Sequence, residues 1–212
     1  MHVDEFNREL LAFLAAATTP FHAVEALVTR LQAAGFTPLP AEQAWPLKAG
    51  GRYYLTRNDS SLIAFTVGTE CPPEAGMRMV GAHTDSPCLM VKPTPEKRRA
   101  GYFQLGVEVY GGALLNPWFD RDLSLAGRVS FADGGGVLRT ATVDFRRPLA
   151  VIPSLAIHLD REANQSRSIN PQTDILPVLS LQADAALPSF RELLRERVLE
   201  EHPDCGVAEG LD

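Results

Sequence analysis

The residues best suited to chemistry in this sequence are His83 and Asp85, which stand two positions apart after an apolar run, residues 79–82 (Met-Val-Gly-Ala). We predict a strand over residues 77–83, broken by the Ser-Pro pair at 86–87. In an extended chain, residues i and i+2 point to the same side. His83 would then face a metal ion while Asp85 accepts the proton of the other ring nitrogen, which fixes the tautomer of the imidazole. The same three-residue spacing also describes an ordinary hydrogen-bonded pair, and spacing alone does not separate the two interpretations.

Other candidate residues carry weaker signals. His158 lies in the apolar run 155–159, which predicts a strand, and it is either a buried or interface histidine or a functional one, since a neutral imidazole serves in both ways. His22 opens an amphipathic helix and is interpreted as structural. The adjacent acids Glu200 and Glu201 end a polar helix with no strand leading to them, so we assign them no catalytic role. A nucleophile elbow of the G-x-S-x-G type and a Walker phosphate loop are both absent from the sequence.

The elements that must position these residues follow from hydrophobic periodicity. Apolar residues at helical spacing predict two helices near the N-terminus, the second ending near Gly35, and alternating runs around a polar turn at 58–60 predict a hairpin. From about residue 93 the chain changes to short strand-like runs separated by Gly and Pro, with no further helical pattern until 190–194. The fold class predicted is α/β, with residues 1–92 in an α/β domain and residues 93–212 in a β-rich insertion.

Composition excludes several classes of protein. The chain has 212 residues, a net charge of −6 and a pI near 5.4, which disfavours a nucleic-acid partner because phosphate binding needs a basic face. Its 3 cysteines are far apart, which suits a reducing compartment. The first residues are acidic rather than basic, and no apolar run is long enough to span a bilayer. We therefore expect a cytoplasmic protein with no membrane partner.

A longer stretch around His83 is far more specific than the histidine and aspartate alone. Residues 80–92 read Val-Gly-Ala-His-Thr-Asp-Ser-Pro-Cys-Leu-Met-Val-Lys, and they closely resemble the signature of the aspartyl aminopeptidase family. Three further stretches resemble that family in the same order along the chain: 20–24 (Pro-Phe-His-Ala-Val), 118–129 (Trp-Phe-Asp-Arg-Asp-Leu-Ser-Leu-Ala-Gly-Arg-Val) and 152–161 (Ile-Pro-Ser-Leu-Ala-Ile-His-Leu-Asp-Arg).

The resemblance implies a metalloaminopeptidase that removes N-terminal Asp or Glu from peptides with a co-catalytic pair of metal ions, usually zinc. It also implies a peptidase α/β catalytic domain interrupted by a β-rich insertion used for dimerisation, through which subunits form homo-oligomers. His83 matches the first metal ligand of the family, and Asp85 matches the carboxylate that orients it. His158 matches a histidine that is either a zinc ligand or a catalytic residue that contacts substrate from a neighbouring subunit, and we favour the substrate contact.

The rest of such a site is not found in the sequence. A catalytic zinc takes about three protein ligands and an open position, whereas His83 supplies one ligand. In the family, the remaining carboxylates and a second histidine follow the insertion. We therefore expect the chain as given to be inactive, whether it is incomplete or a natural truncation. The alternative is a catalytically dead short form that acts as an oligomerisation module.

Overall fold

The computed structural model describes residues 2–70, 76–181 and 189–211, and the chain divides into two compact units, Met1–Ser86 and Pro87–Asp212. Each unit has its own sheets and is described by itself. The division falls a few residues before the expected position at 93, because strand β4 (Cys88–Arg99) begins directly after Pro87 and runs through residue 93 without interruption.

The first unit begins with two helices, α1 (Val3–Ala16) and α2 (Pro20–Ala33), which pack against each other. Both helices confirm the prediction made from hydrophobic periodicity. The start of α2 is set by Thr19, whose side chain accepts a hydrogen bond from a main-chain N–H of the first turn, and by a proline at the first helical position. Its end lies next to Gly35, whose φ of +79° is readily adopted only by a residue without a side chain. In the described part of the chain, none of the helices is both long enough and apolar enough to cross a bilayer.

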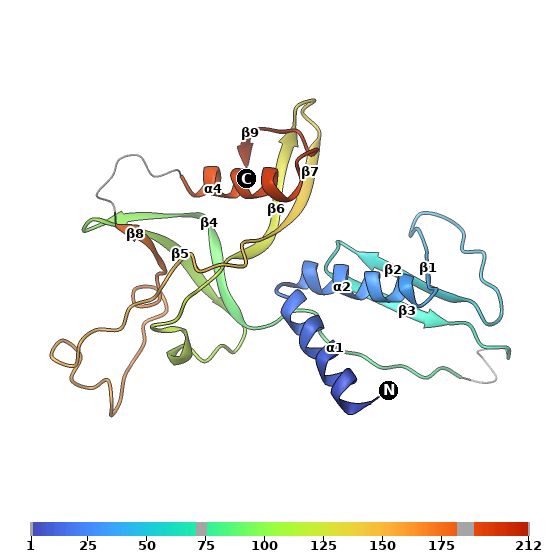
Figure 1. Cartoon of the computed structure of the whole chain (residues 1–212), viewed down its shortest axis with the longest axis horizontal. Helices are drawn as coiled ribbons and strands as arrows, with labels where there is room; N and C mark the ends of the chain where they lie inside the picture. The colour runs from blue at the N-terminus through green and yellow to red at the C-terminus, as the bar shows by residue number, and fades with distance from the viewer. Residues whose placement is uncertain (1, 71–75, 182–188, 212) are drawn as a thin grey trace. The chain divides into compact units, whose positions relative to one another are not determined.

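A small sheet completes the first unit. The predicted hairpin is confirmed as β2 (Arg52–Arg57) paired antiparallel with β3 (Ser61–Thr66), and a short strand, β1 (Thr37–Pro38), pairs parallel with β2. Asn58 and Asp59 in the turn have φ values of 50° and 54°, the left-handed conformation that tight hairpin turns require. In Figure 1, α2 lies along this sheet, which it contacts through β3.

The strand predicted over residues 77–83 is wrong for this chain. Residues 76–83 have no strand partner among the described residues, and the apolar side chains of Met77, Met79 and Val80 are exposed. An isolated extended segment gains no ladder hydrogen bonds, so an apolar run becomes a strand only beside a neighbour with which it can pair.

Among its described residues, the second unit is rich in strands and has two antiparallel sheets and one α-helix (Figure 1). One sheet has the order β4-β5-β8 and the other the order β7-β6-β9. Their strands, besides β4, are β5 (Tyr102–Tyr110), β6 (Ala126–Asp133), β7 (Leu138–Asp144), β8 (Val178–Leu181) and β9 (Val207–Leu211). A short 3-10 helix, η1 (Asn116–Trp118), precedes β6.

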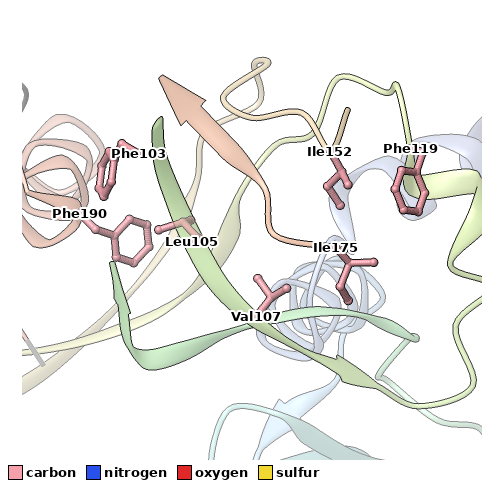
Figure 2. Packing of buried hydrophobic residues seen from close by; sticks show 7 residues of the cluster. All are labelled: Phe103, Leu105, Val107, Phe119, Ile152, Ile175 and Phe190. Carbon is pink, nitrogen blue, oxygen red and sulfur yellow. The ribbon is translucent and has the colours of Figure 1, made fainter. Parts of the chain in front are cut away.

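Two hydrophobic clusters stabilise the second unit. The larger cluster joins β5 to segments far apart in the sequence, and Figure 2 labels its seven buried residues: Phe103, Leu105, Val107, Phe119, Ile152, Ile175 and Phe190. The smaller cluster packs α4 (Phe190–Glu201) against β6 and β7 through Val198, which has no exposed surface. Helix α4 begins with a capping box, in which Ser189 and Glu192 bond reciprocally to each other's main chain.

The larger cluster leads to a stability prediction. Ile175 is 0% exposed, so Ile175→Ala should lower the free energy of unfolding of the second unit by about 2–5 kcal/mol. The matched control is Ile157→Ala, because Ile157 is 46% exposed and loses little burial. Urea denaturation followed by tryptophan fluorescence in a Trp45→Phe background isolates the signal of Trp118, which packs against this cluster. Equal losses in the two variants would show that the cluster does not determine the stability of the unit.

Candidate active-site residues

The imidazole of His83 is held in a defined tautomer by its own chain segment. Its Nδ1 lies 2.6 Å from the main-chain carbonyl oxygen of Asp85 and 3.4 Å from the carboxylate oxygen Oδ1 of the same residue. A carbonyl oxygen only accepts hydrogen bonds, so the ring must donate, which places the proton on Nδ1 and leaves the lone pair on Nε2. The ring proton therefore goes to the main-chain oxygen of Asp85, whereas the carboxylate, the acceptor expected from the sequence, lies further from Nδ1. Sequence patterns carry no signal for a contact to main chain.

The segment that carries His83 is attached to the hairpin of the same unit. The hydroxyl of Thr84 donates a hydrogen bond of 2.7 Å to the main-chain oxygen of Ser60, in the turn between β2 and β3. This contact fixes the residue between His83 and Asp85 although no strand forms there. Thr84 belongs to the motif 80–92, and its contact with the hairpin gives it a structural role that the sequence pattern does not indicate.

The exposed nitrogen of His83 can bind a metal ion but cannot bind it alone. The His83 side chain is 80% exposed, and its Nε2 has no hydrogen-bond partner among the described residues. Within those residues, no group of three or more His, Cys, Asp or Glu side chains gathers closely enough to hold a metal ion. His83 therefore fits as one ligand of a zinc site, since zinc takes about three protein ligands in catalytic sites.

His158 belongs to the second unit, and the strand predicted around it is wrong. Residues 157–159 form a turn, in which the N–H of Leu159 donates to the carbonyl oxygen of Ala156 at 2.8 Å. The turn lies in a long irregular segment between Ile152 and β8, drawn in orange in Figure 1. His158 is exposed, and the apolar residues on either side of it are exposed as well. Alternating burial never arises in this segment, because no described strand lies beside it for pairing.

The other candidate side chains are engaged in structural contacts. His22 is buried, and its Nδ1 lies 2.7 Å from the hydroxyl of Thr19, which is consistent with the structural role expected for it. Glu201 forms an ion pair with Arg197 on the same helix. His202 bonds through Nε2 to a main-chain oxygen of β7 at 2.8 Å. The bond of His202 ties the end of α4 to its sheet, and the ion pair engages Glu201 within the helix.

Residues 13–200 match the sequence profile of the peptidase M18 family, described as aminopeptidase I zinc metalloprotease. The chain belongs to this family of zinc aminopeptidases. The family predicted from the four motifs is thereby confirmed. A curated member, the probable M18 family aminopeptidase 2 of Azotobacter vinelandii, is 57% identical over 198 residues, which cover 93% of this chain and 46% of the relative. The M18 chain described here thus spans about half the length of the curated relatives it matches.

Solved structures of M18 proteins share the fold. A chain in a cryo-EM structure of the Ape4 and Nbr1 complex superposes with a TM-score of 0.86 at 36% identity, over 96% of this chain and 42% of that one. Chaetomium thermophilum mApe1 gives a TM-score of 0.81 at 33% identity, over 96% and 49% of the two chains. A structure of the Saccharomyces cerevisiae mApe1 dodecamer gives 0.71 at 27% identity, over 95% and 44%. The α/β fold class predicted for the chain is confirmed by these likenesses.

Proposed function

We propose that this M18 chain forms the first part of a zinc-dependent aminopeptidase that releases N-terminal Asp or Glu from peptides. The observation that carries the proposal is the imidazole of His83, held at Nδ1 and open at Nε2 within the motif 80–92 of a zinc aminopeptidase family. His83 would hold one ion of a metal pair, and Asp85 would keep its ring in the required tautomer. A bound zinc ion would supply Lewis-acid polarisation at the site. The other ligands would come from polypeptide that the relatives carry beyond the matched half.

We further propose that His158 acts on substrate in a neighbouring subunit rather than as a zinc ligand. Its exposed imidazole sits on a turn among the exposed apolar side chains of Leu155, Ile157 and Leu159, as expected for a segment that another surface covers. A yeast relative is described as a dodecamer, which supports homo-oligomers built through the β-rich residues 93–212. An uncharged imidazole there would donate or accept a hydrogen bond at the substrate.

The proposed compartment is the cytoplasm, with peptides as substrates and neither nucleic acid nor membrane as partner. The net charge of −6 supports the first exclusion. Cys88 and Cys205 form no disulfide, which suits a reducing compartment, and Cys71 lies outside the described residues.

A hybrid enzyme tests the proposal. The hybrid consists of this chain followed by the residues that the Azotobacter vinelandii relative carries beyond its matched part. With added zinc, residues 1–212 alone should release no Asp from an Asp-terminated peptide, because one histidine ligand does not hold a catalytic zinc. The hybrid should release Asp and Glu faster than Leu or Ala. Activity of the isolated chain, or a hybrid that prefers apolar N-terminal residues, would contradict the proposal.

The alternative function is a short, inactive form that joins assemblies of longer M18 subunits. One observation favours it: the second unit has two hydrophobic clusters of its own, whereas the described residues gather no metal site. Size-exclusion chromatography of the tagged chain mixed with the hybrid distinguishes the two functions. Two results together would favour the alternative. The isolated chain is inactive, and it enters assemblies of the hybrid stably without changing the activity per hybrid subunit.

A further inference from the structure

Two motifs that resemble the aminopeptidase family, 118–129 and 152–161, meet in space. Phe119 and Ile152 form a parallel β-bridge, and Figure 2 shows their side chains next to each other within the larger cluster. The proposed function uses His158 from the second motif and nothing from the first. The contacts between them indicate a role for the first motif.

Asp120 is hydrogen-bonded to the start of the segment that carries His158. Its main-chain N–H donates to the carbonyl oxygen of Ile152 at 2.9 Å, and its carboxylate Oδ1 accepts from the N–H of Ser154 at 2.8 Å. Asp120 makes both bonds with a left-handed backbone, φ +54°, a conformation that Asp tolerates better than most residues. The bond from Ser154 holds the pKa of Asp120 below its ordinary value, and the nearby charge of Arg167 acts in the same direction.

Arg167 holds the far end of the segment that carries His158 against Phe119 and Ser154. Its guanidinium carbon lies 3.9 Å from the centre of the Phe119 ring, a cation–π contact. Its Nη1 lies 3.5 Å from the hydroxyl oxygen of Ser154, and its Nε lies 3.8 Å from a carboxylate oxygen of Asp160. Only 19% of the Arg167 side chain is exposed, so these contacts are shielded from solvent. Residues 154 and 167 are thereby brought together, and the turn of His158 lies between them.

We propose that Asp120 and Arg167 are positioning residues, which close the base of segment 154–167 and hold His158 at a fixed place for the reaction. We call these two side chains, with Phe119 and Ser154, the clasp. Closing a segment at both ends removes conformations that its backbone would otherwise sample, so an exposed turn keeps one geometry. The catalytic part of this inference rests on the proposed function of His158, whereas the closure of the segment does not.

Amide hydrogen exchange of residues 1–212 tests the closure. Asp120→Ala and Arg167→Ala should raise exchange of the Ser154 amide and of peptides from 154–167 by about 10–100-fold, as expected for the loss of a charged hydrogen bond. Arg167→Lys should behave like Arg167→Ala, because an ammonium lacks the planar fork that spans Phe119, Ser154 and Asp160. Exchange of the β6–β7 amides should stay unchanged in all three.

Matched controls come from the same two motifs. Asp122→Ala and Arg161→Lys change exposed residues that form no hydrogen bond or ion pair with the clasp among the described residues. They should leave exchange of 154–167 as in the unchanged chain. If Asp120→Ala does not fold, Asp120→Asn retains an oxygen acceptor without the charge and should give a smaller rise. Unchanged exchange in the Asp120 and Arg167 variants overturns the proposal.

A double-mutant cycle in the hybrid enzyme tests the link to His158. Asp120→Ala should lower kcat with KM and zinc content little changed, and it should lower kcat no further when His158→Phe is already present. Additive losses would mean that the clasp acts on activity through something other than His158 and would overturn the positioning role. The exchange result stands independently of activity, so failure of the proposed function and failure of the clasp are distinguishable.

Discussion

Replacing His83 by alanine in the hybrid enzyme is expected to remove one metal ion per subunit and nearly all peptidase activity, with the fold retained. The structure gives the reason: the ring is exposed, its proton is held on Nδ1 by the main chain of Asp85, and Nε2 carries the lone pair that a zinc ion needs. Because His83 would bind the ion directly, the loss should exceed the roughly 10–100-fold that removing a ligand's hydrogen-bond partner costs. Metal analysis by mass spectrometry and turnover of an Asp-terminated peptide measure the two effects.

A matched control for this substitution is His2→Ala, since His2 is also an exposed histidine of the first unit. It should leave metal content and turnover unchanged, and circular dichroism should be the same for both variants. An His83→Ala enzyme that retains its full metal content and near-normal turnover would end the assignment of His83 as a ligand.

Asp85→Asn separates the two acceptors of the His83 proton. If the main-chain oxygen at 2.6 Å is the effective partner, the asparagine variant keeps that bond, and activity should fall less than tenfold. A fall of about 10–100-fold would instead mean that the carboxylate at 3.4 Å is the partner in the complete site.

His158→Phe in the hybrid enzyme should keep zinc at its normal level and abolish most turnover. Phenylalanine fills a similar volume but offers no nitrogen to the substrate. Because His158 is exposed and contributes nothing to the hydrophobic clusters, the substitution should not affect the stability of the second unit. A parallel fall of metal content and activity would identify His158 as a zinc ligand instead.

Subunit mixing tests whether His158 acts in a neighbouring subunit. His158→Phe and His83→Ala hybrids should each be inactive, but a mixed assembly contains sites with an intact His83 and a neighbour's intact His158. Such sites should recover activity, whereas a residue that serves its own subunit gives none. Exchange of subunits is verified by pull-down of a tag carried by one variant. Absence of rescue in a verified mixture would contradict the trans-acting role.

The sequence by itself determined the features that depend on neighbours along the chain. Helices α1 and α2 and the β2–β3 hairpin follow from local periodicity, a proline at a helix start and turn residues such as Asn58 that adopt left-handed backbone. The family was likewise readable from four ordered motifs, and with it the choice of His83. These signals are local, so they need no knowledge of what lies opposite each segment.

Only the tertiary structure decided the features that depend on distant segments. Both apolar runs expected to be strands, around Val80 and around His158, are irregular, because a strand exists through hydrogen bonds to a neighbour that no local pattern specifies. The nearest acceptor for His83 is a main-chain oxygen, and main-chain acceptors are the same at every residue type. The contact of Asp120 with Ser154 spans 34 residues, and it arises because the chain brings the two motifs together at one bridge.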